Sequence, residues 1–212
     1  MSPRTVRETI AGPAGPIECA VDRPTGPPRG FALVCHPHPQ GGGTLDNKVV
    51  QTLARAFLQI GWAGVRFNFR GVGGSAGAWD EGRGEIDDAL AVHAQFRARS
   101  EFAALPFVVA GFSFGGYVAA VVAERLAGAD PARRLLLIAP STEKQQLPPV
   151  APDTVVVHGD DDEVVPLAAT LAWARPQSLP VIVFPGVGHF FHGQLALLKN
   201  VVVRELRDLD TL

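Results

Sequence analysis

The sequence predicts an α/β protein, a doubly wound and mostly parallel sheet flanked by helices on both faces. Short runs rich in β-branched residues alternate along the chain with longer segments of helical periodicity. The short runs are predominantly apolar, as expected of parallel strands that are buried on both faces. The length of 212 residues, 47% of them hydrophobic, suits a single domain over residues 1–212 with a sizeable core.

Six short apolar runs bounded by turn residues are predicted to form the buried strands. Two further segments, 4–10 and 16–22, flank the turn sequence GPAGP and are predicted to add an antiparallel hairpin at the sheet edge. The six strand segments are 31–35, 63–69, 106–111, 134–139, 154–159 and 180–186.

Five helices are predicted between and after these strands. The first has Asp46 as its candidate N-cap and Gly61 as its stop signal. The fourth has Pro166, a residue suited to the first helical position. The five segments are 46–60, 84–99, 114–127, 166–174 and 193–208.

Composition and charge exclude several classes of function. The formal net charge of −2 provides no basic surface for nucleic acid or for an anionic membrane. The longest apolar runs span about seven residues, far short of the roughly 18 that a membrane-spanning helix needs. The N-terminal segment carries Arg4, Arg7 and Glu8 where a signal peptide would be apolar, so we expect a cytoplasmic location. Cys19 and Cys35 lack partners at metal-ligand spacing and are expected to be reduced thiols.

The strongest functional signal is the pattern G-x-S-x-G at residues 111–115, between a predicted strand and a predicted helix. A sharp strand-to-helix turn needs unusual backbone angles and close packing, both of which glycine tolerates. The turn also places Ser113 at a helix N-terminus, where free N–H groups and the helix dipole stabilise developing negative charge. Ser113 is therefore the candidate nucleophile. The alternative is a structural glycine turn with an incidental serine.

With this motif in its strand–turn–helix setting, residues 31–206 resemble the α/β-hydrolase superfamily. The resemblance is to small lidless bacterial serine hydrolases, of the dienelactone-hydrolase-like and carboxylesterase-like kind. Members carry the nucleophile, the acid and the histidine in that order along the chain. The segment HGDDDEVVP at 158–166 is similar to the family's H-G-x-x-D-x-x-V-P acid loop, which implies Asp162 as the acid. The segment GHF at 188–190 is similar to the family's histidine loop, which implies His189 as the base.

Other residues remain candidates for these two roles. Asp160, Asp161 and Glu163 share the acidic turn with the implied acid and are its rivals. His192 is the alternative base, three positions beyond the implied one. His158 ends a predicted strand and is expected to orient the acid loop.

A tetrahedral intermediate formed on the serine needs two N–H donors for its oxygen. The resemblance implies the backbone N–H of Phe114, the residue after the nucleophile, as one donor. The second is expected from residues 35–43, the loop after the first parallel strand. His38 is the expected donor and Gln40 the next candidate, because the two prolines in this loop have no N–H.

Two alternative sites are weighed against this interpretation. His36 and His38 have a His-x-His spacing found in metal sites, but no cysteine or carboxylate cluster accompanies them. Residues 71–76 mimic the G-x-G-x-x-G/A fingerprint of NAD-binding oxidoreductases, yet the next predicted strand ends in glycine where an acidic residue belongs. We expect no metal and no organic cofactor. Arg70 is expected either in a rim salt bridge or as a clamp for a substrate carboxylate.

The sequence thus predicts a serine hydrolase that cleaves small carboxylic esters or thioesters through an acyl-enzyme on Ser113. The alternatives are a non-catalytic binding module of the same fold and an NAD-binding Rossmann oxidoreductase. The expected partner is a small-molecule ester or thioester, with no nucleic acid and no membrane. Residues 140–153 are too few to roof a deep tunnel, so we expect an open site that prefers acyl chains of about two to six carbons.

Overall fold

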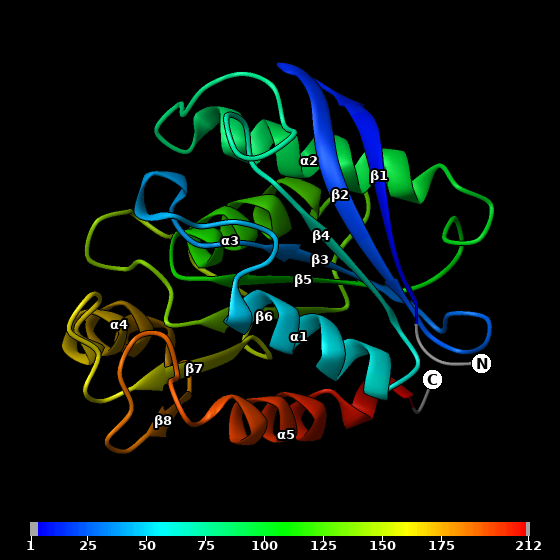
Figure 1. Ribbon diagram of the computed structural model, residues 1–212. Helices are drawn as coiled ribbons and strands as arrows, with labels where there is room; N and C mark the ends of the chain where they lie inside the picture. The colour runs from blue at the N-terminus through cyan, green and yellow to red at the C-terminus, as the bar shows by residue number, and fades with distance from the viewer. Residues whose placement is uncertain (1–3, 211–212) are drawn as a thin grey trace.

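The computed structural model describes residues 4–210, which form one eight-stranded sheet in the order β1-β2-β4-β3-β5-β6-β7-β8 (Figure 1). The strands β1 (Arg4–Gly12) and β2 (Gly15–Arg23) make an antiparallel hairpin, and β2 pairs antiparallel with β4. All other neighbours in the sheet are parallel. The predicted mostly parallel sheet with an antiparallel edge hairpin is confirmed.

The six parallel strands follow the apolar runs of the sequence. They are β3 (Phe31–Cys35), β4 (Ala63–Phe67), β5 (Phe107–Phe112), β6 (Arg134–Ile138), β7 (Val155–Gly159) and β8 (Val181–Phe184). The strand β4 ends before the predicted residue 69. The N–H of Asn68 still donates to the carbonyl of Glu18 on β2 at 2.9 Å, but the N–H of Phe69 donates to the side chain of His36 at 3.0 Å and not to a strand carbonyl.

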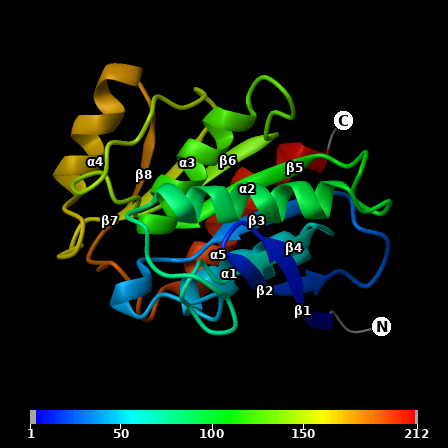
Figure 2. The same cartoon turned by 90° about the horizontal axis from the view of Figure 1, so that it is seen from above.

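Helices cover both faces of the sheet (Figure 2). One face is covered by α1 (Lys48–Gln59) and α5 (Leu195–Glu205), and the other by α2 (Arg83–Arg97), α3 (Phe114–Leu126) and α4 (Leu167–Ala174). Short 3-10 helices lie at Pro39–Gly41, Arg175–Gln177 and Arg207–Asp210. Within residues 4–210, no helix is long and apolar enough to cross a membrane.

The prediction of Asp46 as the N-cap of α1 is wrong. The side-chain oxygen of Asn47 accepts hydrogen bonds from the N–H groups of Val49 (2.9 Å) and Val50 (3.4 Å). Asp46 instead accepts hydrogen bonds from the guanidinium groups of Arg7 at 2.5 Å and Arg66 at 3.3 Å. Both residue types are good caps, and the ion pair from β4 decides between them.

Two other helices begin slightly later than predicted. Pro166 is the N-cap of α4 and not its first helical residue, with a φ of −57°. The helix α5 starts at Leu195 because Gly193 has a φ of 75°, a left-handed conformation that a helix does not contain. The carboxyl ends of the parallel strands all meet at one edge of the sheet, where their loops carry the candidate residues.

Candidate active site

Ser113 occupies a sharp turn between β5 and α3. Its backbone has φ 57° and ψ −120°, a region that residues with side chains rarely adopt. Three hydrogen bonds hold this conformation. The N–H of Ser113 donates to the carbonyl of Ile138 (2.9 Å), and its carbonyl accepts from the N–H groups of Gly116 (2.9 Å) and Ser141 (3.1 Å). The strained turn is therefore fixed by β6 and by the loop that follows it.

The glycines on either side make the turn sterically possible. A Cβ on Gly111 would lie 2.0 Å from the carbonyl oxygen of Gly115. A Cβ on Gly115 would lie 2.3 Å from the carbonyl oxygen of Cys35. Both clashes are with backbone atoms, one in α3 and one in β3, which cannot move aside. The G-x-S-x-G pattern thus reflects the close approach of α3 to β3 and β5.

The side chains of Ser113, His189 and Asp162 form a continuous hydrogen-bonded chain. Nε2 of His189 lies 3.0 Å from Oγ of Ser113, and its Nδ1 lies 2.7 Å from Oδ2 of Asp162. A carboxylate accepts only, so Nδ1 carries the proton and Nε2 is left to accept one from the serine. The three buried residues come from the ends of β5 and β7 and from the loop between β8 and α5.

Asp162 is held as an anion by several donors. Its Oδ1 accepts hydrogen bonds from the N–H groups of Val164 (2.9 Å) and Val165 (2.8 Å). Its Oδ2 faces both His189 and Nε2 of His158, the latter at 3.3 Å. Burial raises the pKa of the Asp162 carboxyl, but the hydrogen bonds from the two histidines and from Val165 outweigh it and hold that pKa well below its usual range.

His158 ties the acid loop to the end of β7. Its ring is fully buried, and Nε2 lies 2.8 Å from the carbonyl oxygen of Val165. Because that carbonyl only accepts, Nε2 carries the proton and shares it with Oδ2 of Asp162. Among the described residues, Nδ1 of His158 has no hydrogen-bond partner. The ring thus orients the carboxylate and donates nothing to the serine.

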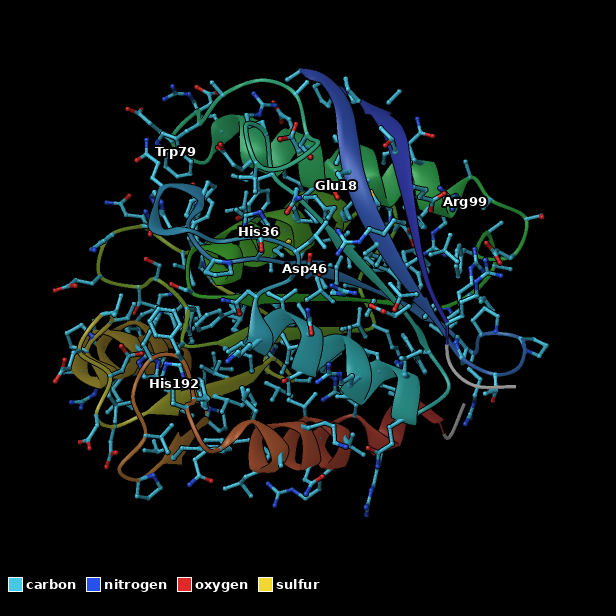
Figure 3. The ribbon with its side chains drawn as sticks, viewed as in Figure 1. Glu18, His36, Asp46, Trp79, Arg99 and His192 are labelled. Carbon is cyan, nitrogen blue, oxygen red and sulfur yellow. The ribbon has the colours of Figure 1, made fainter. Side chains whose placement is uncertain are left out.

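The rival acids and the rival base lie outside this chain of contacts. Oδ1 of Asp160 accepts a hydrogen bond from the N–H of Gly186 at 2.5 Å and so joins the loops after β7 and β8. Asp161 and Glu163 are exposed. His192 is exposed on the loop before α5 (Figure 3), where its ring stands beside that of Phe190 and not beside the serine.

Two backbone N–H groups at the cavity of Ser113 are the candidate donors to a developing oxyanion. That of Phe114 belongs to the first residue of α3 and so has no partner within its helix. His38, Gln40 and Phe114 line the same cavity as Ser113. The N–H of Gln40 donates to Nδ1 of His38 at 3.2 Å, whereas no hydrogen bond of the His38 N–H is found within residues 4–210. His38 therefore remains the better candidate of the two.

The rings of His36 and His38 are engaged with the protein itself. Nδ1 of the buried His36 lies 2.6 Å from the carbonyl of Pro37, and its Nε2 accepts a hydrogen bond from the N–H of Phe69 at 3.0 Å. Burial lowers the pKa of His36 to about 4, so the ring is neutral. The His38 ring packs on Trp79 with 4.3 Å between centroids. The pair joins the loops after β3 and β4 and is not arranged around a cation.

The glycine-rich loop at 71–76 surrounds a carboxylate of the protein, where a dinucleotide fingerprint would surround a phosphate. Oε2 of Glu18 accepts hydrogen bonds from the N–H of Gly74 (2.8 Å) and from the amide of Asn68 (2.7 Å). Oγ of Ser75 donates to the carbonyl of Asn68 at 2.7 Å and accepts from the N–H of Glu18 at 3.0 Å. These contacts fix the loop to the edge hairpin, which argues against an NAD site.

Arg70 makes a bidentate ion pair with Asp88 of α2. Its Nε and Nη2 lie 3.0 and 2.8 Å from the two carboxylate oxygens, and its backbone N–H donates to the same group at 3.0 Å. Asp88 is buried. A Cβ on Gly84 would lie 1.8 Å from Nη1 of Arg70, so the guanidinium rests directly on the helix. Of the two roles open to Arg70, the structure contains the rim salt bridge.

Ser113 opens into a cavity of about 350 Å³. Its walls are the loop after β3, the start of α3, the loop after β6 and the two valines that follow the acid. This volume lies near the lower end of the range for small-molecule sites. Lys144, on the loop after β6, also lines the cavity. No motif in the sequence signals this residue, because it lies in a proline-rich segment without helical or strand periodicity.

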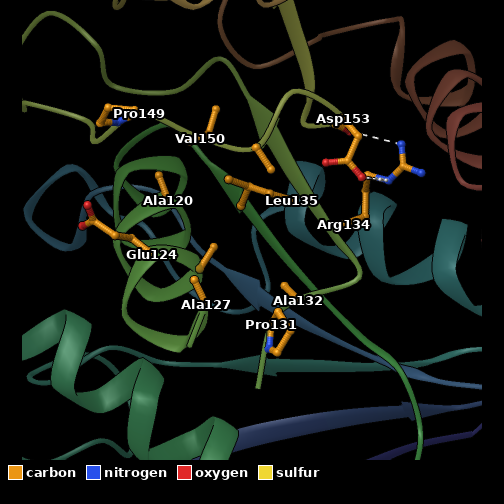
Figure 4. Close-up of a pocket in the computed structure, with 12 residues that line it drawn as sticks. Ala120, Glu124, Ala127, Pro131, Ala132, Arg134, Leu135, Pro149, Val150 and Asp153 are labelled. Atoms are coloured by element: carbon orange, nitrogen blue, oxygen red, sulfur yellow. Dashed lines mark hydrogen bonds and ion pairs between the residues drawn. The ribbon is translucent and has the colours of Figure 1, made fainter. Parts of the chain in front are cut away.

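A separate apolar hollow of about 260 Å³ lies beside the C-terminal half of α3 (Figure 4). Alanine and proline side chains make up much of its wall, together with Leu135. An ion pair between Arg134 and Asp153, 3.5 Å apart, stands at its rim. It is remote from Ser113, which precedes the opposite end of the same helix, so it does not belong to the candidate site.

Comparison with known proteins places this geometry in a family. Residues 37–153 match the model of the alpha/beta hydrolase fold family. A solved alpha-beta serine hydrolase homologue from Coxiella burnetii is 39% identical, with a TM-score of 0.86 over 95% of this chain and 97% of that one. A lidless a/b serine hydrolase from Xanthomonas campestris is 36% identical, with a TM-score of 0.88 over 99% of this chain and 96% of that one.

A curated protein sequence is also similar to this chain. An uncharacterized protein of Rickettsia prowazekii (strain Madrid E) is 34% identical over 160 residues, which is 73% of this chain. This chain spans 66% of that relative's length. Since the family model covers more than half of the chain and the similar structures cover nearly all of it, the chain belongs to the alpha/beta hydrolase family, as the sequence resemblance implied.

Proposed function

We propose that the protein hydrolyses small carboxylic esters or thioesters through an acyl-enzyme on Ser113. The observation that carries this proposal is the chain of contacts from Asp162 through His189 to Ser113, with 2.7 and 3.0 Å between successive partners. Membership of the alpha/beta hydrolase family supports it.

The geometry supports a definite sequence of proton transfers. Oγ of Ser113 attacks the ester carbonyl while Nε2 of His189 takes the hydroxyl proton. The anionic Asp162 stabilises the imidazolium that results and keeps its ring in place. The N–H groups of Phe114 and His38 would donate to the oxyanion of the tetrahedral intermediate. His189 then gives its proton to the leaving alcohol or thiol, and a water activated in the same way releases the acid.

The size of the cavity limits the substrate. About 350 Å³ holds a short acyl chain, and the loop between β6 and β7 carries four prolines that discourage a covering helix. We expect a preference for acyl chains of about two to six carbons, because a longer chain finds no further apolar surface. A series of nitrophenyl esters tests this. A kcat/KM that keeps rising to twelve or more carbons would reveal an acyl channel and contradict the expectation.

Covalent labelling tests the assignment of the nucleophile. A fluorophosphonate probe reacts with a serine only when a neighbouring base activates it. We expect the probe to modify Ser113, with the site located by peptide mapping, and Ser113→Ala to abolish the labelling. A folded wild-type protein that stays unlabelled would overturn the proposed function and favour a non-catalytic binding role.

A further inference from the structure

The cavity beside Ser113 carries one unbalanced charge. Lys144 is a cationic residue of its wall, which it shares with His38. None of the described residues that line the cavity is aspartate or glutamate. Glu143 precedes Lys144 in the sequence, and Glu163 precedes Val164. Both glutamates are exposed, but neither lines the cavity. Lys144 is therefore the one cation among the described residues of the cavity wall.

Lys144 is not committed to a partner within the protein. Its side chain is exposed, and within residues 4–210 it makes no hydrogen bond or ion pair. This distinguishes it from Arg70, which is locked on Asp88 at the same end of the sheet. A flexible ammonium with three donors can turn toward an anion that enters the cavity.

The charge of Lys144 reaches the catalytic end of the cavity. Burial lowers the pKa of the His38 ring, and the nearby ammonium of Lys144 lowers it further, against an opposing effect of the Glu85 carboxylate. The N-terminus of α3, which begins directly after Ser113, adds positive potential from the same direction. An anionic group bound here stands a few bonds from the serine, because the cavity is only about 350 Å³ in volume.

We propose that Lys144 forms an anion subsite in this cavity, so that the enzyme prefers esters or thioesters whose acyl or alcohol part carries a carboxylate. The inference rests on the proposed hydrolase function and narrows its substrate class. From the sequence, Arg70 was the candidate for binding a substrate carboxylate. Because Arg70 is already paired with Asp88, this role falls to Lys144.

Matched substrates isolate the contribution of charge. Monoethyl succinate and ethyl butanoate differ by a carboxylate in place of a terminal methyl group on the acyl side. The pair 4-acetoxybenzoate and 4-methylphenyl acetate makes the same comparison on the alcohol side. In at least one of these pairs the carboxylate should contact Lys144. For that pair, Lys144→Gln should lower kcat/KM of the anionic ester about five- to tenfold and change kcat/KM of the neutral ester less than about twofold. Lys144→Glu should lower kcat/KM of the anionic ester further, because the two negative charges repel each other.

Two controls accompany the measurement. Lys48→Gln removes another exposed lysine, in the first turn of α1 and outside the cavity, and should change neither ester of a pair. Added salt should narrow the preference of the wild type for the anionic ester, since a partly exposed ion pair is screened.

The outcomes separate the two proposals. If Lys144→Gln changes the anionic and the neutral ester equally in both pairs, the anion subsite is wrong. If the neutral esters are hydrolysed and Ser113 is labelled by fluorophosphonate, that failure leaves the proposed hydrolase function standing. If no ester is hydrolysed and Ser113 stays unlabelled, the hydrolase function fails and the subsite fails with it.

Discussion

The two halves of the candidate site are held together in different ways. In the half formed by Ser113, His189 and Asp162, side chains contact side chains, and each comes from a different strand end. In the half formed by the loops after β3 and β4, side chains mostly hold backbone, as His36 does with the N–H of Phe69. Substitutions in the first half should remove chemical steps, whereas those in the second should change stability and position.

The largest effect should come from the serine and its base. Ser113→Ala should lower kcat/KM for a short ester by about 10⁴ or more while leaving the fold intact. His189→Ala should have an effect of similar size, and the double variant should be little worse, because the two residues act as one unit. Steady-state kinetics on all three variants tests this. Losses that multiply in the double variant, or a larger effect at His192, would contradict the assignment.

Substitution of Asp162 should have the next largest effect on catalysis, and Asp160, two positions before it, is the control. Asp162→Asn should lower kcat by about 10² to 10⁴, because the amide no longer holds His189 in the correct tautomer. Asp160→Asn should change kcat less than about threefold, since asparagine keeps the oxygen that accepts from Gly186. If Asp160 proves the more costly position, the acid has been misassigned within the acidic turn.

His158 should have an intermediate effect that distinguishes positioning from chemistry. His158→Ala removes the donor shared by Asp162 and the Val165 carbonyl, and should lower kcat about tenfold with little change in KM. His158→Gln should recover part of the loss, because its amide N–H can occupy the position of Nε2. An equal loss in both variants, with unchanged thermal stability, would mean that His158 acts on the reaction directly.

The smallest expected effect concerns stability in the loop half of the site. His36 titrates near pH 6.5 when unfolded and near 4 when folded, because burial disfavours its charged form. As pH drops, His36 is therefore protonated in the unfolded chain before it is protonated in the folded protein. Between about pH 6.5 and about pH 4 the free energy of unfolding should fall by about 3 kcal/mol. Urea unfolding across this range should show the decline. His36→Asn should flatten it, and an unchanged slope would contradict the assignment.

The same division explains what the sequence could predict. The motifs around Ser113, Asp162 and His189 are local, since each follows a strand of the sheet, and their chain order is preserved by the fold. Contacts of the loop half join residues far apart in the chain. The pair Glu18–Gly74 and the pair His36–Phe69 are separated by 56 and 33 positions, and no local pattern announces them.

Element boundaries failed for the same reason. Asp46 and Asn47 are equally good helix caps by residue type, and the choice depends on Arg66, which approaches from β4. The strand β4 ends before Phe69, whose N–H donates to the side chain of His36 and not to a strand carbonyl. In each case a polar partner from another part of the fold overrides the local propensity.

The left-handed backbone of Ser113 sets stability and activity against each other at a single position. A residue with a side chain in such a conformation costs about 1–3 kcal/mol, whereas glycine adopts it freely. Glycine at this position would therefore fold better and catalyse nothing. In a lineage that no longer needed the reaction, selection for stability alone would replace this serine early. On the proposed function, the serine is kept despite this cost in stability because its hydroxyl is the nucleophile.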